Sequence, residues 1–235
     1  MKKKKQKLIF VVLLLLAATP IFANSEIGIS ASLNSNTIWS GSDYYDERST
    51  SNLVGYSLSI PYQYNFNSRI SLRTEFSYIT KNYTEDTYQN YDESITYEYH
   101  YNSYVEFPVM GHLYLGPTEN QFKPFVNFGA YFSYWLSAST SGEYLNISSI
   151  SGVDTSSDSN YTTVETEGFD DNDNRYNYGL LGGIGFEYEV QRHIKASFET
   201  RLTADLTSIY STDQIDAVDE YNVTIESNFA FVYSF

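Results

Sequence analysis

Ionic side chains of both signs recur at alternate positions along several segments of the chain. In an extended strand, residues two apart point to the same side, so each such row lies on one face of its segment. Opposite charges on facing rows can pair in a narrow interior, where an isolated charge would be costly. We therefore predict that a polar network lines the interior of a closed sheet. Its predicted members are Arg69, Arg73, Glu75, Glu106, Glu187, Lys195, Glu199 and Arg201.

The three histidines, His100, His112 and His193, offer little for catalysis. His100 and His112 are 12 residues apart, about 40 Å along a strand at ~3.3 Å per residue, so they cannot share one site. His100 with Glu98 or a loop aspartate leaves a hydrolase formally open, but no nucleophile motif accompanies it. The chain has no cysteine, which excludes disulfides and thiolate chemistry. We predict no catalytic residues and no cofactor.

An acidic stretch, 139–174, is a candidate for cation binding because clustered carboxylates and amides are ligands for hard cations. Asp170, Asp171 and Asp173 form the weak candidate for a metal site. Their spacing lacks the glycine and the distal glutamate of a calcium-binding loop. We therefore interpret the stretch as a solvated anionic surface loop and expect no metal.

The elements that would position these side chains are strands, because apolar residues alternate with polar ones with a period of two. No segment after the N-terminal stretch has a helical period. Phe125, Tyr131 and Trp135 are exceptions, since they fall on the otherwise polar side of their strand. The eight predicted strands are 27–33, 54–66, 69–78, 95–115, 122–138, 175–190, 194–206 and 221–235.

The connections between these strands alternate in length. Short links are predicted at 65–68, 116–120 and 191–193, and long polar links at about 35–51, 81–93, 139–174 and 207–220. Short turns at one end and long loops at the other, with an even number of strands, are typical of a membrane barrel. The pattern predicts an all-β fold: a single eight-stranded antiparallel up-and-down transmembrane barrel with short periplasmic turns and long extracellular loops. The fourth strand exceeds the 9–11 residues that span a bilayer, so we predict that 94–102 projects outward as a rigid hairpin with the fifth strand.

The N-terminal 23 residues are typical of a secretory signal peptide. Five lysines precede an apolar core at 8–18, which is too short to span a membrane, and Ala23 suits cleavage. We predict a signal peptide at 1–23 and a barrel domain at 24–235. Removing the signal leaves nine basic residues against 29 acidic ones, a net charge of about −20. Nucleic-acid binding is disfavoured, because phosphate contacts need positive charge.

The last strand carries aromatic residues at alternate positions up to the final residue, at Phe231, Tyr233 and Phe235. It resembles the final strand of bacterial outer-membrane barrels, in which the terminal Phe is part of a signal read by the barrel-assembly machinery. We expect it to pair with the strand that begins near Ile27 and so to close the barrel.

Three further stretches resemble the eight-stranded "outer membrane protein β-barrel domain" (porin-family, OmpA/OmpX-like) proteins of Bacteroidetes-type bacteria. They are an acid two residues before a proline in 104–115, a Lys-Pro entry in 123–136 and a glycine-rich strand in 178–188. The resemblance implies a barrel in the outer membrane of a diderm bacterium. It implies little about function, since many members have none assigned.

Together these patterns favour a structural or surface-interaction role through acidic extracellular loops, without enzymatic activity. A narrow passive channel is the alternative, although side chains roughly fill an eight-stranded barrel, and an outer-membrane enzyme is the third. The expected partners are outer-membrane lipid and the barrel-assembly machinery, not nucleic acid. We expect a monomer, and the extracellular ligand stays open.

Overall fold

The computed structural model describes residues 24–40, 48–89, 94–117, 120–145, 161–169, 173–210 and 219–235. The predicted signal peptide at 1–23 therefore lies outside the described residues. Within the described ranges no helix is long and apolar enough to cross a membrane. The strands are β1 Ser25–Ser40, β2 Arg48–Asn65, β3 Ile70–Thr80, β4 Tyr83–Gln89, β5 Ser94–Tyr114, β6 Phe122–Leu145, β7 Tyr161–Glu167, β8 Tyr176–Gln191, β9 Ile194–Asp205 and β10 Glu220–Ser234.

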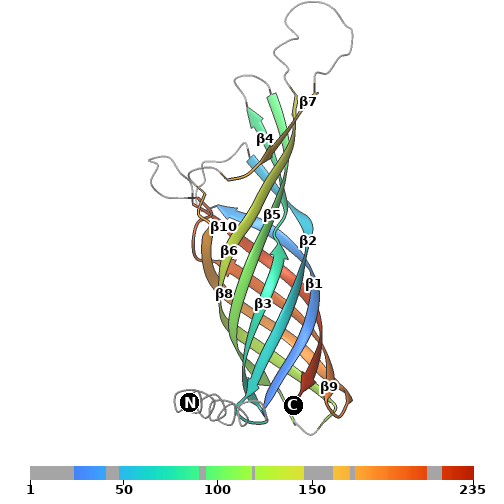
Figure 1. Ribbon diagram of the computed structural model, residues 1–235. Coiled ribbons are helices and arrows are strands. Elements are labelled where there is room, and N and C mark those ends of the chain that lie inside the picture. The colour runs from blue at the N-terminus through green and yellow to red at the C-terminus, as the bar shows by residue number, and fades with distance from the viewer. Residues whose placement is uncertain are drawn as a thin grey trace, which may run out of the picture.

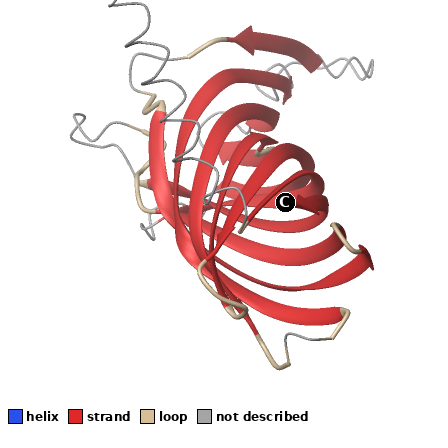
Figure 2. Ribbon diagram, turned by 60° about the horizontal axis from the view of Figure 1, so that its bottom comes forward, coloured by secondary structure: helices blue, strands red, loops and turns tan. Residues whose placement is uncertain are grey.

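Eight of these strands close into a ring. Each is antiparallel to its neighbours in the order β1, β2, β3, β5, β6, β8, β9 and β10. Figure 2 shows the strands curving around a common axis. The closing pair is β1 with β10, whose register runs from Glu26 opposite Ser234 to Ser40 opposite Glu220. The predicted eight-stranded antiparallel barrel and the predicted pairing of its two ends are confirmed.

The other two strands, β4 and β7, extend the wall beyond the ring at the end with the long connections (Figure 1). β4 continues β3 after the irregular residues Lys81 and Asn82, and it pairs with the start of β2 and with β5. β7 pairs with the outer part of β6. Residues 94–102 are regular strand, and 95–102 pair with β6, so the predicted outward projection is confirmed.

Three of the predicted long links are consequently too long. The stretch 35–51 includes the end of β1 and the start of β2, 81–93 contains β4, and 139–174 contains the end of β6 and all of β7. These segments are mostly polar, with Ile38, Trp39 and Tyr83 among the exceptions, so they lack the regular alternation that marks a strand in the sequence. Backbone pairing with the neighbouring strands keeps them extended all the same. The link predicted at 207–220 is confirmed to within one residue at each end, since β9 ends at Asp205 and β10 starts at Glu220.

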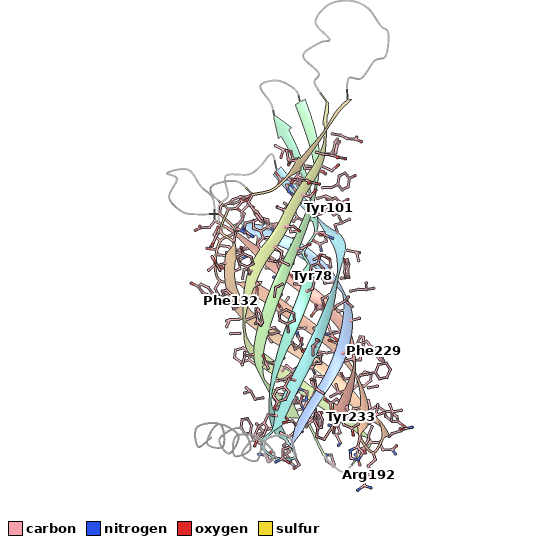
Figure 3. The ribbon with its side chains drawn as sticks, in the orientation of Figure 1. Tyr78, Tyr101, Phe132, Arg192, Phe229 and Tyr233 are labelled. Atoms are coloured by element: carbon pink, nitrogen blue, oxygen red, sulfur yellow. The ribbon has the colours of Figure 1, made fainter. Side chains whose placement is uncertain are left out.

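The barrel wall has its apolar side chains outside and its polar side chains inside. On β10, Ile225 and Phe229 are 55% and 47% exposed, whereas Glu226 and Asn228 between them are 5% and 3% exposed. Figure 3 shows side chains such as Phe229 and Phe132 standing away from the wall. A soluble protein buries its apolar residues, so this arrangement fits a wall surrounded by hydrocarbon.

Glycines on the inner side of β8 make room for aromatic side chains of β6. A Cβ atom on Gly179 would lie 2.6 Å from the ring of Tyr131, and one on Gly185 would lie 2.6 Å from the ring of Phe125. Both rings are buried in the interior, as expected for residues on the polar side of their strand. These two rings therefore fill part of the barrel interior.

Candidate functional site

The middle of the barrel interior is occupied by a cluster of two arginines and two glutamates. Arg73 and Glu75 alternate on β3, and Glu199 and Arg201 alternate on β9, so all four point inward. Arg201 contacts Glu75 and Glu199, each at 2.9 Å, and Arg73 contacts Glu75 at 2.8 Å. Glu226 of β10 lies 3.7 Å from Arg201. Each buried charge of this cluster therefore lies close to at least one charge of opposite sign, which offsets part of the cost of burying it.

A second cluster lies toward the end with the short turns. The Lys195 ammonium is 2.6 Å from Glu26 and 3.5 Å from Glu187. The Tyr114 hydroxyl donates a hydrogen bond of 2.8 Å to Glu187 and accepts one of 3.0 Å from Gln63. A pocket of about 350 Å³ opens at this end and includes Lys195 and Glu26 in its lining.

A third cluster lies toward the opposite end of the interior. Its centre is Lys81, whose ammonium is 3.3 Å from Glu106 and 3.7 Å from Asp205. The same ammonium lies over the rings of Tyr104 and Tyr131, at 5.2 and 5.0 Å from their centroids. The Tyr131 hydroxyl donates a hydrogen bond to Asp205. One lysine thus holds two carboxylates and two aromatic rings together.

Beyond the third cluster, aromatic and aliphatic side chains close the mouth of the barrel. Tyr104 and Trp135 stack with centroids 5.6 Å apart, and Phe169 packs edge-on against Trp135 at 5.1 Å. Arg175 stabilises this group, because its guanidinium donates two hydrogen bonds to the Trp135 carbonyl oxygen, at 3.0 and 3.1 Å. It also lies 4.1 Å from the centroid of the Phe169 ring. These contacts hold Phe169 and Arg175 against the mouth.

A second apolar cluster lies at the same end of the barrel. Ile38 of β1, Tyr83 of β4 and Ile209 from the connection after β9 pack together, and Tyr210 joins them. Asn174 donates a backbone hydrogen bond of 2.8 Å to Ile209, which ties the two connections to each other. Burial raises the pKa of the Tyr83 hydroxyl well above its ordinary value, so this side chain stays neutral.

The predicted network is largely where the sequence places it, with one correction. Arg73, Glu75, Glu106, Glu187, Glu199 and Arg201 are buried inside the barrel, and Lys195 is mostly buried. Arg69 is not a member, because its side chain is exposed. It lies in the turn before β3, where Asn67 accepts backbone hydrogen bonds from Arg69 and Ile70. The alternation points Arg69 inward, but the wall begins one residue later.

Four further members of the network are not among the predicted residues. Glu26, Asp205 and Glu226 stand on inward rows, and their alternation with apolar neighbours is a signal that could have found them. Lys81 carries no such signal. It lies in the irregular step between β3 and β4, which resembled the start of a loop, and only the three-dimensional fold aims it into the interior.

The histidines do not meet, as their spacing predicted. His112 is buried in the interior, 3.8 Å from Glu187, and His193 lies exposed in the turn between β8 and β9. His100 stands on the projecting sheet, stacked on Tyr83, with the Thr140 hydroxyl 3.2 Å from its Nδ1. The hydrolase alternative named Glu98 or a loop aspartate beside His100. Nε2 of His100 lies 3.4 Å from a carboxylate oxygen of Glu98 and 3.8 Å from one of Glu85, so Glu98 is the predicted neighbour that the structure places there.

Only one of the three aspartates of the candidate metal site lies among the described residues. Asp170 and Asp171 lie outside the described residues, and Asp173 forms an isolated backbone bridge with Tyr210. Among the residues that the structure describes, no group of three or more metal-binding side chains is arranged to hold an ion. The predicted role of these aspartates stays untested.

A closed antiparallel ring with an apolar outside, a charged inside and short turns at one end defines a transmembrane β-barrel. Residues 19–211 match the model of the family described as "Outer membrane protein beta-barrel domain". The chain belongs to this family and is an outer-membrane protein. In barrels of this kind the short turns face the periplasm and the long connections face the outside.

Solved structures with the same fold include outer membrane protein OprG from Pseudomonas aeruginosa, at 13% sequence identity and a TM-score of 0.50, covering 91% of this chain and 96% of that one. Neisserial surface protein A is 14% identical, with a TM-score of 0.44 and coverages of 90% and 97%. Outer membrane protein W of E. coli is 14% identical, with a TM-score of 0.43 and coverages of 91% and 98%. At such identities the likeness concerns the fold alone. A comparison with curated protein sequences gives no match.

Proposed function

We propose that this protein is a closed outer-membrane barrel that anchors a rigid sheet at the cell surface and acts there through structural or binding contacts. The observation that carries the proposal is the two-point ion pair of Arg201 with Glu75 across the middle of the interior. A permeating ion would have to separate these buried charges, and separating them is costly in a low-dielectric interior.

The aromatic closure supports the same proposal from the outer end. Phe169 packs on Trp135 at the mouth, and the pocket of about 350 Å³ at the other end has Glu26 and Lys195 of the second cluster in its lining. That pocket is the feature that favours the alternative, a narrow passive channel.

Liposome swelling distinguishes the closed barrel from the channel. We expect vesicles carrying the protein to swell no faster than empty ones in isosmotic sugar. Swelling that scales with protein content would favour the channel.

We further propose that the protein is not an enzyme and needs no cofactor. Among the described residues, an enzymatic role could use His100 with Glu98 at its Nε2 and Thr140 at its Nδ1. Purified protein should not hydrolyse a chromogenic ester or release fatty acid from lipopolysaccharide. Hydrolysis that His100→Ala abolishes, while the variant still folds, would favour the enzyme.

For partners, we propose outer-membrane lipid around the wall, the barrel-assembly machinery at the closing strand, and a monomeric state. Phe231, Tyr233 and Phe235 are 48%, 47% and 53% exposed on the outside of β10. Phe235→Ser should lower the fraction of protein assembled in cells. Leu115→Ser is the matched control, because Leu115 lies at the same end with 44% exposed. Equal losses in both variants would argue against an assembly signal.

Light scattering in detergent tests the oligomeric state. A dimer mass would refute the monomer.

A further inference from the structure

Three tyrosines form a column on the outer face of the projecting sheet. Tyr97, Tyr99 and Tyr101 occupy alternate positions of β5, so their side chains leave the same face. They are 41%, 44% and 46% exposed. Figure 3 labels Tyr101 near the base of this sheet, above the barrel wall. We name this column the tyrosine face.

Carboxylates flank the tyrosine face on both sides. Tyr97 pairs with Asp86 on β4 and with Glu143 on β6. On β7, Glu165 and Glu167 lie one strand further out, opposite Ser141 and Ser139 of β6. All four acids are exposed. Among the described residues in register with the column, those on the same face include no lysine, arginine or histidine.

The tyrosine face is distinct from the lipid-facing wall below it. Lower on the same side of β5, Phe107 and Val109 are exposed and apolar. The outer side of β5 changes from apolar to tyrosine-rich at Ser103. There the β5–β6 register shifts, and the Tyr78 hydroxyl donates a hydrogen bond to Ser103. Tyr97 lies six residues farther, about 20 Å along the strand. Carboxylates would be unfavourable against hydrocarbon, so this face stands outside the membrane.

The backbone that carries the tyrosine face is regularly paired on both sides. β5 pairs continuously with β6 from Ile95 to Tyr114, with one register shift, and β4 and β7 flank the projecting part. A sheet fixed by backbone hydrogen bonds loses little freedom when something docks on it, which reduces the entropy cost of binding. Tyrosines suit this role, since they are enriched at protein interfaces and keep one polar atom for solvent or partner.

We propose that the tyrosine face docks a Lys- or Arg-rich segment of a partner polypeptide. Cations are attracted to the faces of tyrosine rings, and the four surrounding carboxylates complement a positive charge and repel a negative one. A strand-like segment with basic residues at alternate positions would place successive charges at the spacing of the column. This inference rests on the proposed surface role and names the class of partner that the role would use.

The test uses the full chain in detergent micelles and fluorescently labelled decalysine as the probe, with decaglutamate as the opposite-charge control. We expect decalysine to bind, decaglutamate not to bind, and decalysine binding to weaken as salt rises from about 50 to about 500 mM. Tyr99→Ser should weaken decalysine binding about two- to fivefold, the effect of an exposed cation–π contact. The triple change Tyr97→Ser, Tyr99→Ser and Tyr101→Ser should weaken it about tenfold or more.

Two matched controls localise the effect. Tyr99→Phe keeps the ring and should bind decalysine as the parent does. Asp219→Asn removes an exposed acid from the start of the last strand, away from the tyrosine face, and should change binding less than Glu143→Gln. Heat-modifiable gel migration shows that each variant is folded.

Absence of decalysine binding, or equal losses in Glu143→Gln and Asp219→Asn, would overturn the proposal. So would full binding by the folded triple tyrosine variant. These failures are separable from failure of the proposed function, because vesicles carrying the parent protein would still report a closed barrel. Swelling of those vesicles would instead contradict the proposed function itself.

Discussion

Arg201 and Glu75 form a two-point ion pair straight across the barrel: Nη2 donates to Oε1 at 2.9 Å and Nη1 to Oε2 at 3.1 Å. Their strands, β9 and β3, are opposite in the ring, with three strands between them in either direction. The pair therefore acts as a strut between opposite walls. Paired hydrogen bonds between an arginine and a carboxylate are both stronger and more specific in geometry than a single contact.

Arg201→Ala should strongly destabilise the barrel. The substitution leaves Glu75, Glu199 and Glu226 close together with fewer positive charges between them. Breaking a buried pair in this way costs about 3–5 kcal/mol in the free energy of unfolding. Urea titration in detergent, followed by gel migration of the folded and unfolded forms, measures it. Arg69→Ala, in the exposed turn, should change the same quantity by no more than about 0.5 kcal/mol.

The double change Glu75→Leu with Arg201→Met should recover much of that loss, because it removes both charges instead of stranding one. A double variant as unstable as Arg201→Ala would show that the strut is not the main role of Arg201.

Gly179→Ala should destabilise the fold, and Gly182→Ala should not. A Cβ on Gly179 would press on the Tyr131 ring and on the Ala204 carbonyl oxygen, whereas one on Gly182 would meet only the Asn127 carbonyl oxygen at 3.8 Å. Overpacking of this kind costs about 1–3 kcal/mol. Urea titration of both variants measures the difference, and equal stabilities would mean that the Tyr131 ring can move aside freely.

The aromatic closure can be followed through Trp135, which is 6% exposed, whereas the second tryptophan, Trp39, is 60% exposed. In a Trp39→Phe background, Trp135 fluorescence should be poorly quenched by acrylamide. Adding Phe169→Ala should increase quenching clearly, because Phe169 covers the indole. Leu136→Ala is the control, since Leu136 is next in sequence but faces outward with 41% exposed. If the two additions gave the same quenching, Phe169 would not be the cover.

The sequence alone predicts the ring well, because each wall strand separates hydrocarbon from a polar interior and so alternates strictly. The same alternation identifies Arg73, Glu75, Glu199 and Arg201 as interior groups. It fails for β4 and β7, which lie beyond the lipid-facing wall, so their outer faces carry polar residues such as Asp86 and Glu165. It also fails at the margins of the wall: Arg69 precedes β3 by one residue, and Lys81 follows it by one. There the tertiary fold, not the period, decides which way a side chain points.

Ionic current through a planar bilayer tests the closed barrel most directly. The parent protein, inserted from detergent, should give no current above the bare bilayer at either polarity, while a known porin in the same chamber gives clear steps. The buried pairs around Arg201, Lys81 and Lys195 and the aromatic cover of Trp135 all oppose a continuous water path. Steady, reproducible conductance steps from the parent protein would contradict the closed barrel and favour a channel.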